Sequence, residues 1–146
     1  HDAIRKMFQR NGLPEGSFFV TGNLSYEEVK DYISAADIGL SAVPPTPSQK
    51  FRSPTKVAEY LLCGLPYITC EGVSEDDIYA KKYNVGAVVK SFDENHISES
   101  IPQIRNLLNE EKVSIRERCR KVGVLYRGKS NIDSLFHQFF QETYVH

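Results

Sequence analysis

The sequence has little net charge, few cysteines and no long apolar run, and each absence excludes a class of protein. Its 18 basic and 19 acidic side chains leave a net charge of −1, which gives no reason to expect a nucleic-acid-binding protein. Cys63, Cys70 and Cys119 are odd in number and lack metal-like spacing, which favours buried, reduced thiols over a disulfide framework. No apolar stretch approaches the roughly 20 residues of a membrane-spanning helix, and we expect no signal peptide. The predicted location is the cytoplasm, at most peripheral at the inner face of a membrane.

The composition is close to that of an ordinary globular domain. Apolar residues make up 40% and charged residues 25% of the 146 residues, enough for one hydrophobic core. The chain begins at His1 rather than Met, and Ile4, Met7 and Phe8 follow the spacing of an amphipathic helix that ends near Gly12. We therefore expect that further sequence precedes His1 in the natural protein.

Short apolar runs rich in β-branched residues alternate with helical patterns along the chain. They predict four strands, at 17–21, 38–42, 67–70 and 86–90. Strands that are nearly all apolar, each separated from the next by a helix, are typical of right-handed βαβ units and of a parallel sheet with helices on both faces. The predicted fold class is therefore α/β and Rossmann-like.

Capping residues and apolar stripes mark the helices. Ser25 and Glu28 have the spacing of a capping box, which predicts a helix that begins there and buries a stripe including Tyr32. Ser74 and Asp77 predict a second helix start of the same kind. Two stripes predict helices towards the C-terminus, one formed by Ile97, Ile101, Ile104, Leu107 and Leu108 and one by Ile132, Leu135, Phe136, Phe139 and Phe140.

The loop at 43–52 and the helix after it carry the features that point to chemistry. The loop holds several prolines, so we expect neither a helix nor a central strand there. Ser53 is the predicted N-cap of the next helix and Pro54 its first residue, which leaves free backbone N–H groups facing the cleft at the carboxyl ends of the strands. Lys56 is predicted at the third helical position, where a cation near the positive end of the helix dipole is unfavourable by up to ~1 kcal/mol. An anionic ligand bound there makes the interaction favourable. With Arg52 just before the turn, the charge suits a diphosphate better than a carboxylate.

Glu59 lies on the side of the same helix that it shares with Thr55 and Lys56, away from the apolar stripe. Two interpretations are open. A carboxylate so placed can hydrogen-bond to the hydroxyls of a ribose. It can equally form an exposed ion pair with Lys56 at i, i+3, which is worth only ~0.3 kcal/mol.

Four segments together match a known sequence pattern. They are the strand Phe-Val-Thr-Gly at 19–22, the helix and strand at 27–41, the helix Ser-Pro-Thr-Lys-Val-Ala-Glu-Tyr-Leu at 53–61 with its turn Cys-Gly-Leu-Pro at 63–66, and the strand Gly-Ala-Val-Val at 86–89. Through them about half of the chain resembles the C-terminal, donor-binding domain of group 1, family 4 type, glycosyltransferases with the GT-B fold. Single motifs of this kind are weak signals, and their combination is far more specific.

The resemblance implies a domain that holds the nucleotide-diphosphate part of an activated sugar. It assigns the ribose to Glu59, the diphosphate to Ser53, Pro54, Thr55, Lys56 and Arg52, and the nucleobase to Gly22, Asn23 and Leu24. Phe51 stands where the family usually has a second glutamate that contacts the donor sugar, so the sugar itself is not predicted.

We therefore expect residues 1–146 to form a single nucleotide-sugar-binding domain of a larger, two-domain glycosyltransferase of hexosyltransferase type, inactive by itself. The donor is a UDP-sugar or GDP-sugar, the acceptor binds the missing N-terminal domain, and the product is a polysaccharide, lipopolysaccharide or glycolipid. No metal cofactor is expected, because protein cations carry the phosphate charge and there is no carboxylate cluster to bind a divalent ion. A nucleotide-sugar epimerase on the same fold and a non-catalytic Rossmann-like binding module are the alternatives.

Two further features have open interpretations. The stretch 112–129 is basic, formed by Lys112, Arg116, Arg118, Arg120, Lys121, Arg127 and Lys129 against Glu117 alone. Such a helix is either a solvated face or a peripheral contact with anionic lipid. His96 and His137 have no sequence neighbours at the spacing of a metal site or a catalytic triad, so we assign them no chemistry.

Overall fold

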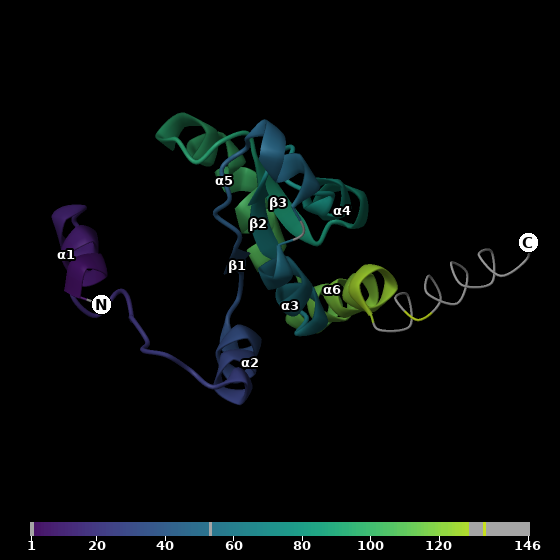
Figure 1. Cartoon of the computed structure of the whole chain (residues 1–146), viewed down its shortest axis with the longest axis horizontal. Coiled ribbons are helices and arrows are strands. Elements are labelled where there is room, and N and C mark those ends of the chain that lie inside the picture. Colours follow the sequence, from purple (N-terminus) through teal and green to yellow (C-terminus); the bar gives the residue numbers. More distant parts are fainter. Residues whose placement is uncertain (1, 53, 129–132, 134–146) are drawn as a thin grey trace, which may run out of the picture. The chain divides into compact units, whose positions relative to one another are not determined.

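The computed structural model describes residues 2–52, 54–128 and 133 (Figure 1). The chain divides into two compact units, His1–Asp31 and Tyr32–His146, and each is described by itself. The predicted helix at 132–140, with His137, lies outside the described residues.

The first unit contains α1 (Asp2–Arg10) and the irregular segment that follows it. The helix ends as predicted, because Gly12 adopts φ 77° and turns the chain in the left-handed region. The rings of Phe8 and Phe18 lie edge to face, with their centroids 4.8 Å apart. The predicted strand at 17–21 is wrong: the segment is irregular and Phe19 is 75% exposed. A strand is stabilised by pairing with a neighbour, and the described residues of this unit hold no second strand.

Helix α2 (Tyr26–Ala35) confirms the predicted capping box. The Ser25 backbone N–H donates to Glu28 Oε2 over 2.7 Å, and the Glu28 N–H donates to Ser25 Oγ over 3.3 Å. These hydrogen bonds lower the pKa of Glu28. The predicted burial of its stripe is wrong, since no side chain of α2 is fully buried and Tyr32 is 49% exposed. The end of the helix is held by polar contacts instead, because the Arg116 guanidinium donates to the carbonyls of Ser34 and Ala36.

The second unit is built on a parallel sheet of three strands in the order β1-β2-β3 (Figure 1). The strands are β1 (Gly39–Leu40), β2 (Tyr67–Cys70) and β3 (Gly86–Val89). Tyr67 pairs with Gly39 on one side and with Gly86 on the other. Three of the four predicted strands are thus present, and the α/β fold class with a parallel sheet is confirmed.

Helices connect these strands and cover them. Helix α3 (Thr55–Leu62) leads from β1 to β2, and α4 (Asp76–Tyr83) leads from β2 to β3. The main core is formed by the buried residues Val57, Leu61, Tyr67, Ala80, Val85, Ala87, Leu107, Ile115, Cys119 and Val122. Every helix and strand from α3 to α6 contributes to it. Val57, in the first turn of α3, places the start of this helix against the core.

The start of α4 differs from the prediction. Glu75 is the N-cap without a side-chain bond, and Ser74 adopts φ 57° instead of capping the helix. The buried Asp77 carboxylate accepts hydrogen bonds from the backbone N–H groups of Gly72 and Ile78. Since Asp77 binds the turn between β2 and α4, its oxygens do not complete a capping box with Ser74.

Helix α5 (Glu94–Asn109) begins at an Asp93 cap, whose side chain accepts from the His96 N–H. His96 Nδ1 also lies 2.6 Å from Asp93 Oδ2, so this histidine belongs to the cap. The predicted apolar stripe is only partly buried: Leu107 lies in the core, whereas Ile97 and others remain exposed. Only part of the apolar stripe of α5 packs against β3 and the core, so its other residues remain exposed.

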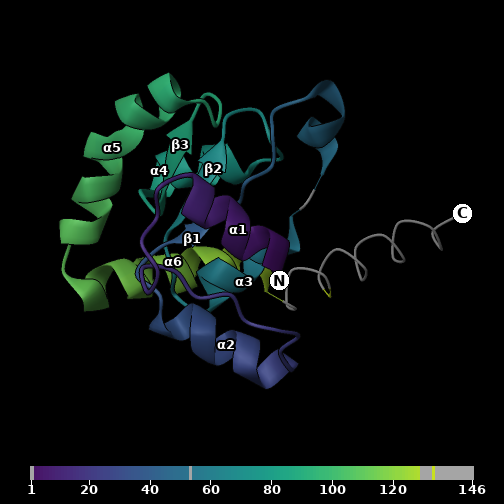
Figure 2. The ribbon, with the colours of Figure 1, turned by 90° about the vertical axis from the view of Figure 1, so that its left-hand side faces the viewer.

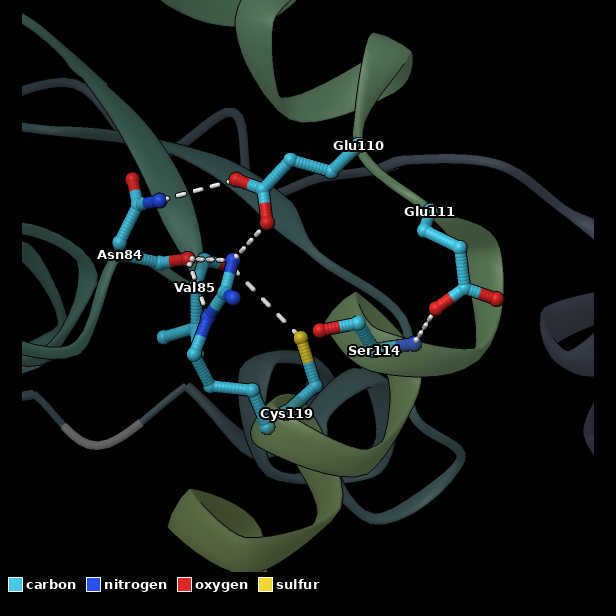
Figure 3. A network of polar contacts seen from close by, with 7 residues as sticks. Asn84, Val85, Glu110, Glu111, Ser114 and Cys119 are labelled. Atoms are coloured by element: carbon cyan, nitrogen blue, oxygen red, sulfur yellow. Dashed lines mark hydrogen bonds and ion pairs between the residues drawn. The ribbon is translucent and has the colours of Figure 1, made fainter.

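Helix α6 (Lys112–Arg127) runs beside α3 in both views (Figures 1 and 2). Gly123 permits this approach, because a Cβ there would lie 2.9 Å from the Leu61 carbonyl carbon. A polar network fastens the other side of α6 to the turn before β3 (Figure 3). In it the Arg118 guanidinium donates to the Asn84 carbonyl and pairs with Glu110 at 2.6 Å.

Candidate functional site

The start of α3 is the feature on which the predicted site depends. Pro54 is the N-cap, with φ −63° and ψ 114°, and Thr55 is the first helical residue. The prediction that Pro54 opens the helix is therefore wrong by one position, because its ring fixes φ at a helical value while ψ stays extended. Lys56 becomes the second helical residue. Ser53, the predicted N-cap, lies outside the described residues.

The first turn of α3 keeps free hydrogen-bond donors. The Pro54 side chain makes no capping bond, and the Pro54 carbonyl accepts from the Val57 N–H at 3.2 Å. Within the described part of the chain, no side chain caps the N–H groups of Thr55 and Lys56. Free N–H groups together with the positive end of the helix dipole favour an anion at this position.

A pocket of about 390 Å³ opens at the same place. Its walls are the chain that leaves β1, from Leu40 to Val43, and the start of α3 with the residue before it, namely Arg52, Pro54, Thr55 and Lys56. The structure thus brings together all four described members of the predicted diphosphate set. The loop between the two walls contains a 3₁₀ turn, η1 (Pro47–Phe51), where neither helix nor strand was expected. A proline in its first turn leaves no hydrogen bond unmade.

The charge of this pocket is positive and uncompensated. Arg52 and Lys56 have exposed side chains, and neither forms an ion pair with any residue that the structure describes. No acidic side chain is among the residues that line the pocket. The arrangement therefore attracts an anionic ligand and repels a cationic one.

Glu59 is half-buried on α3 and is not among the residues that line this pocket. The exposed ion pair with Lys56, one of the two interpretations of the sequence, is not formed in the structure. The negative charge of Glu59 acts on its neighbour instead: burial first, and this charge second, raise the pKa of Tyr60. The assignment of Glu59 to a ribose stays a prediction.

Ser41 is a member of this pocket that the sequence did not single out. It follows β1, it is 1% exposed, and its hydroxyl lacks a hydrogen-bond partner among the described residues. Buried polar groups without partners are rare in native structures. The one signal in the sequence is a hydroxyl residue between a buried strand and a proline-rich loop, which is too common a pattern to identify a site.

The predicted nucleobase residues belong to the first unit. Gly22, Asn23 and Leu24 lie in the irregular segment just before α2, with Gly22 and Asn23 exposed and Leu24 partly buried. The pocket at α3 belongs to the second unit. The role of these three residues stays a prediction.

The remaining candidate groups have structural roles. Cys70 and Cys119 are free thiols in the core, and burial raises the pKa of both, that of Cys119 to about 12. Among the described residues, no three side chains of the metal-binding types gather into a possible metal site.

The cations of the basic stretch at 112–129 differ in their contacts. Lys112 forms an exposed ion pair with Asp37, and Arg116 and Arg118 bind backbone carbonyls, so these three cations have partners within the fold. Arg120 and Lys121 are exposed on α6. A contact of this face with anionic lipid stays a prediction. No helix in the described ranges has both the length and the apolar character needed to cross a bilayer.

Comparison with known proteins places the fold and leaves the family open. No protein-family model and no curated protein sequence matches the chain. Among solved structures, the chain is similar to a sucrose-phosphate synthase from Thermosynechococcus elongatus, with a TM-score of 0.65 and 21% sequence identity. The match covers 97% of this chain and 34% of that protein, so the chain spans about a third of its length. The likeness shows the fold alone, and that fold belongs to the α/β class that the sequence predicts.

Proposed function

We propose that this chain is the donor-binding domain of a GT-B glycosyltransferase of the group 1, family 4 type. In this proposal it holds the diphosphate of a UDP-sugar or GDP-sugar while a separate N-terminal domain presents the acceptor. The products are polysaccharides, lipopolysaccharides or glycolipids. The likeness to a sucrose-phosphate synthase supports the fold that such a domain requires.

One observation carries the proposal. The pocket beside β1 combines the uncapped N-terminus of α3 with two cations, Arg52 and Lys56, that have no acidic partner in the described structure. A diphosphate supplies the charge and the acceptor atoms that such a pocket lacks, since each phosphoryl oxygen accepts hydrogen bonds from N–H donors. Its volume of about 390 Å³ lies within the usual range of small-molecule sites.

The same groups provide a chemical mechanism. When a sugar leaves a nucleotide diphosphate, negative charge develops on the departing diphosphate. Donors and cations already aimed at that position stabilise the transition state more than the ground state, which lowers the barrier. Glu59 is proposed to bind the ribose, which fixes the nucleotide relative to the pocket. The proposal requires no divalent cation, because protein cations and the helix dipole balance the charge.

The test is calorimetric titration and nuclear magnetic resonance shift mapping of the full chain with UDP and with GDP. We expect shifts centred on the first turn of α3, and a loss of affinity of about tenfold or more in Lys56→Glu, which reverses a pocket charge. Lys121→Glu is the matched control, because it reverses an exposed lysine on α6 and is expected to leave the affinity unchanged. Shifts scattered away from α3, or equal losses in both variants, contradict the proposal.

A further inference from the structure

Ser41 carries a buried hydroxyl that the fold leaves without a partner. Its backbone is fully used: the N–H donates to the Ile68 carbonyl at 2.9 Å, and its carbonyl accepts from the Val43 N–H at 2.9 Å. The side chain Oγ has no partner in the described structure, although the residue is only 1% exposed. A buried hydroxyl without a hydrogen-bond partner costs free energy, and a ligand that supplies an acceptor reduces this cost.

The direction of this side chain follows from the strand before it. Successive side chains of a strand point to opposite faces, so Ser41 lies on the same face as Gly39, and Leu40 on the other. Gly39 faces α3, because its missing Cβ would meet the Tyr60 ring. In agreement with this alternation, Gly39 and Ser41 are buried and Leu40 is exposed. The Ser41 side chain therefore lies on the α3 face of the sheet, and Ser41 is one of the residues that line the pocket at the helix start.

We propose that Ser41 is a ligand-contacting residue whose hydroxyl donates a hydrogen bond to a phosphoryl oxygen of a bound nucleotide diphosphate. This inference rests on the proposed function and gives the wall of the pocket that follows β1 a role in binding the ligand. It assigns one phosphoryl group to the side of the pocket formed by the residues that follow β1.

The neighbours of Ser41 decide the class of acceptor. The pocket lining offers donors and positive charge, from the α3 backbone, Arg52 and Lys56, and holds no carboxylate. A sugar hydroxyl brings a donor as well as an acceptor, and its donor finds no side-chain acceptor on these walls except Ser41 and Thr55. A phosphoryl oxygen brings acceptors only, and thereby satisfies Ser41 and the helix N-terminus together.

The test compares two buried hydroxyls, one just after β1 and one on the neighbouring strand β2. Thr69 on β2 is also fully buried with an unpartnered Oγ1, and it does not line the pocket. Titration of the full chain with UDP is expected to show affinity weakened by about tenfold in Ser41→Ala and unchanged in Thr69→Val. The melting temperature without ligand is expected to stay at or above that of the original chain in both variants, because each removes an unsatisfied hydroxyl.

A second variant guards against a cavity effect. Ser41→Cys leaves no cavity, because the sulfur is larger than the oxygen that it replaces, and it offers only a weak donor, so we expect a loss of UDP affinity of similar size with the fold intact. If the original chain binds UDP at α3 and both Ser41 variants bind it equally well, this inference is overturned and the proposed function stands. Equal losses in the Ser41 variants and in Thr69→Val also overturn it, since they indicate a general effect on the sheet. If the original chain shows no binding of UDP or GDP, the proposed function fails and this inference with it.

Discussion

The ring of Tyr60 lies directly on the backbone of Gly39, where a Cβ would come within 2.6 Å of the ring carbon Cδ2. The Tyr60 hydroxyl reaches past this contact and donates to the Leu40 carbonyl at 3.2 Å. One side chain thus fastens α3 to β1 through a close approach and a hydrogen bond. Because the proposed pocket lies between the end of β1 and the start of α3, this contact sets the distance between its walls.

The first prediction concerns Gly39→Ala. The added methyl group overlaps the Tyr60 ring, so either the ring or the strand must shift, and overpacking of this kind costs about 1–3 kcal/mol. Urea denaturation of the variant is expected to show that loss in the free energy of unfolding. Gly22→Ala is the matched control, because nothing lies within 4 Å of its added Cβ. A Gly39→Ala variant as stable as the Gly22→Ala variant would show that Tyr60 has room to move.

The second prediction concerns the ribose. Glu59→Gln keeps the size of the side chain and removes its charge, which weakens hydrogen bonds to two ribose hydroxyls. We expect the affinity for UDP to fall by about tenfold while the affinity for inorganic pyrophosphate, which has no ribose, stays the same. Calorimetric titration with both ligands measures the difference. A rise in the affinity for pyrophosphate would place the Glu59 charge near the phosphates, an equal fall for both ligands would indicate a general effect on the pocket, and no fall for either ligand would remove Glu59 from the site.

The sequence predicted best those elements that local pattern determines. The strands at β2 and β3 were predicted within one residue, because an apolar run between two helices has few other conformations in an α/β fold. The capping box at Ser25 and Glu28 was confirmed for the same reason, since its atoms lie within one turn. Local chemistry and structure agree wherever the partners are near in sequence.

The failures concern features that depend on distant partners. The predicted strand at 17–21 has apolar residues, but the described residues of its own unit contain no strand with which it could pair. Ser41 becomes a candidate ligand contact only because α3 packs against β1. The two elements are far apart in the sequence: Tyr60 and Leu40, which are hydrogen-bonded, are separated by twenty residues. The role of Gly39 also depends on a distant partner. In the sequence it interrupts an apolar run, and in the structure it leaves space for the Tyr60 ring.

The third prediction concerns pH. Hydrogen bonds from Ser91 and His96, with that from Ser91 the larger effect, hold the pKa of Asp93 well below its ordinary value of about 3.9. Since the folded chain binds this proton less readily than the unfolded chain, the charged cap stabilises the fold above the unfolded pKa, and this stabilisation is lost as the pH falls below it. Asp93→Asn keeps a capping side chain and has no such proton to bind. We therefore expect the original chain to be more stable than the variant at pH 7, and the difference to shrink steadily as the pH falls from about 4 towards 2. Denaturation of both chains across that range measures the difference, with Glu94→Gln, at an exposed position, as the control. A difference that stays constant with pH would mean that the Asp93 charge contributes nothing to the α5 cap.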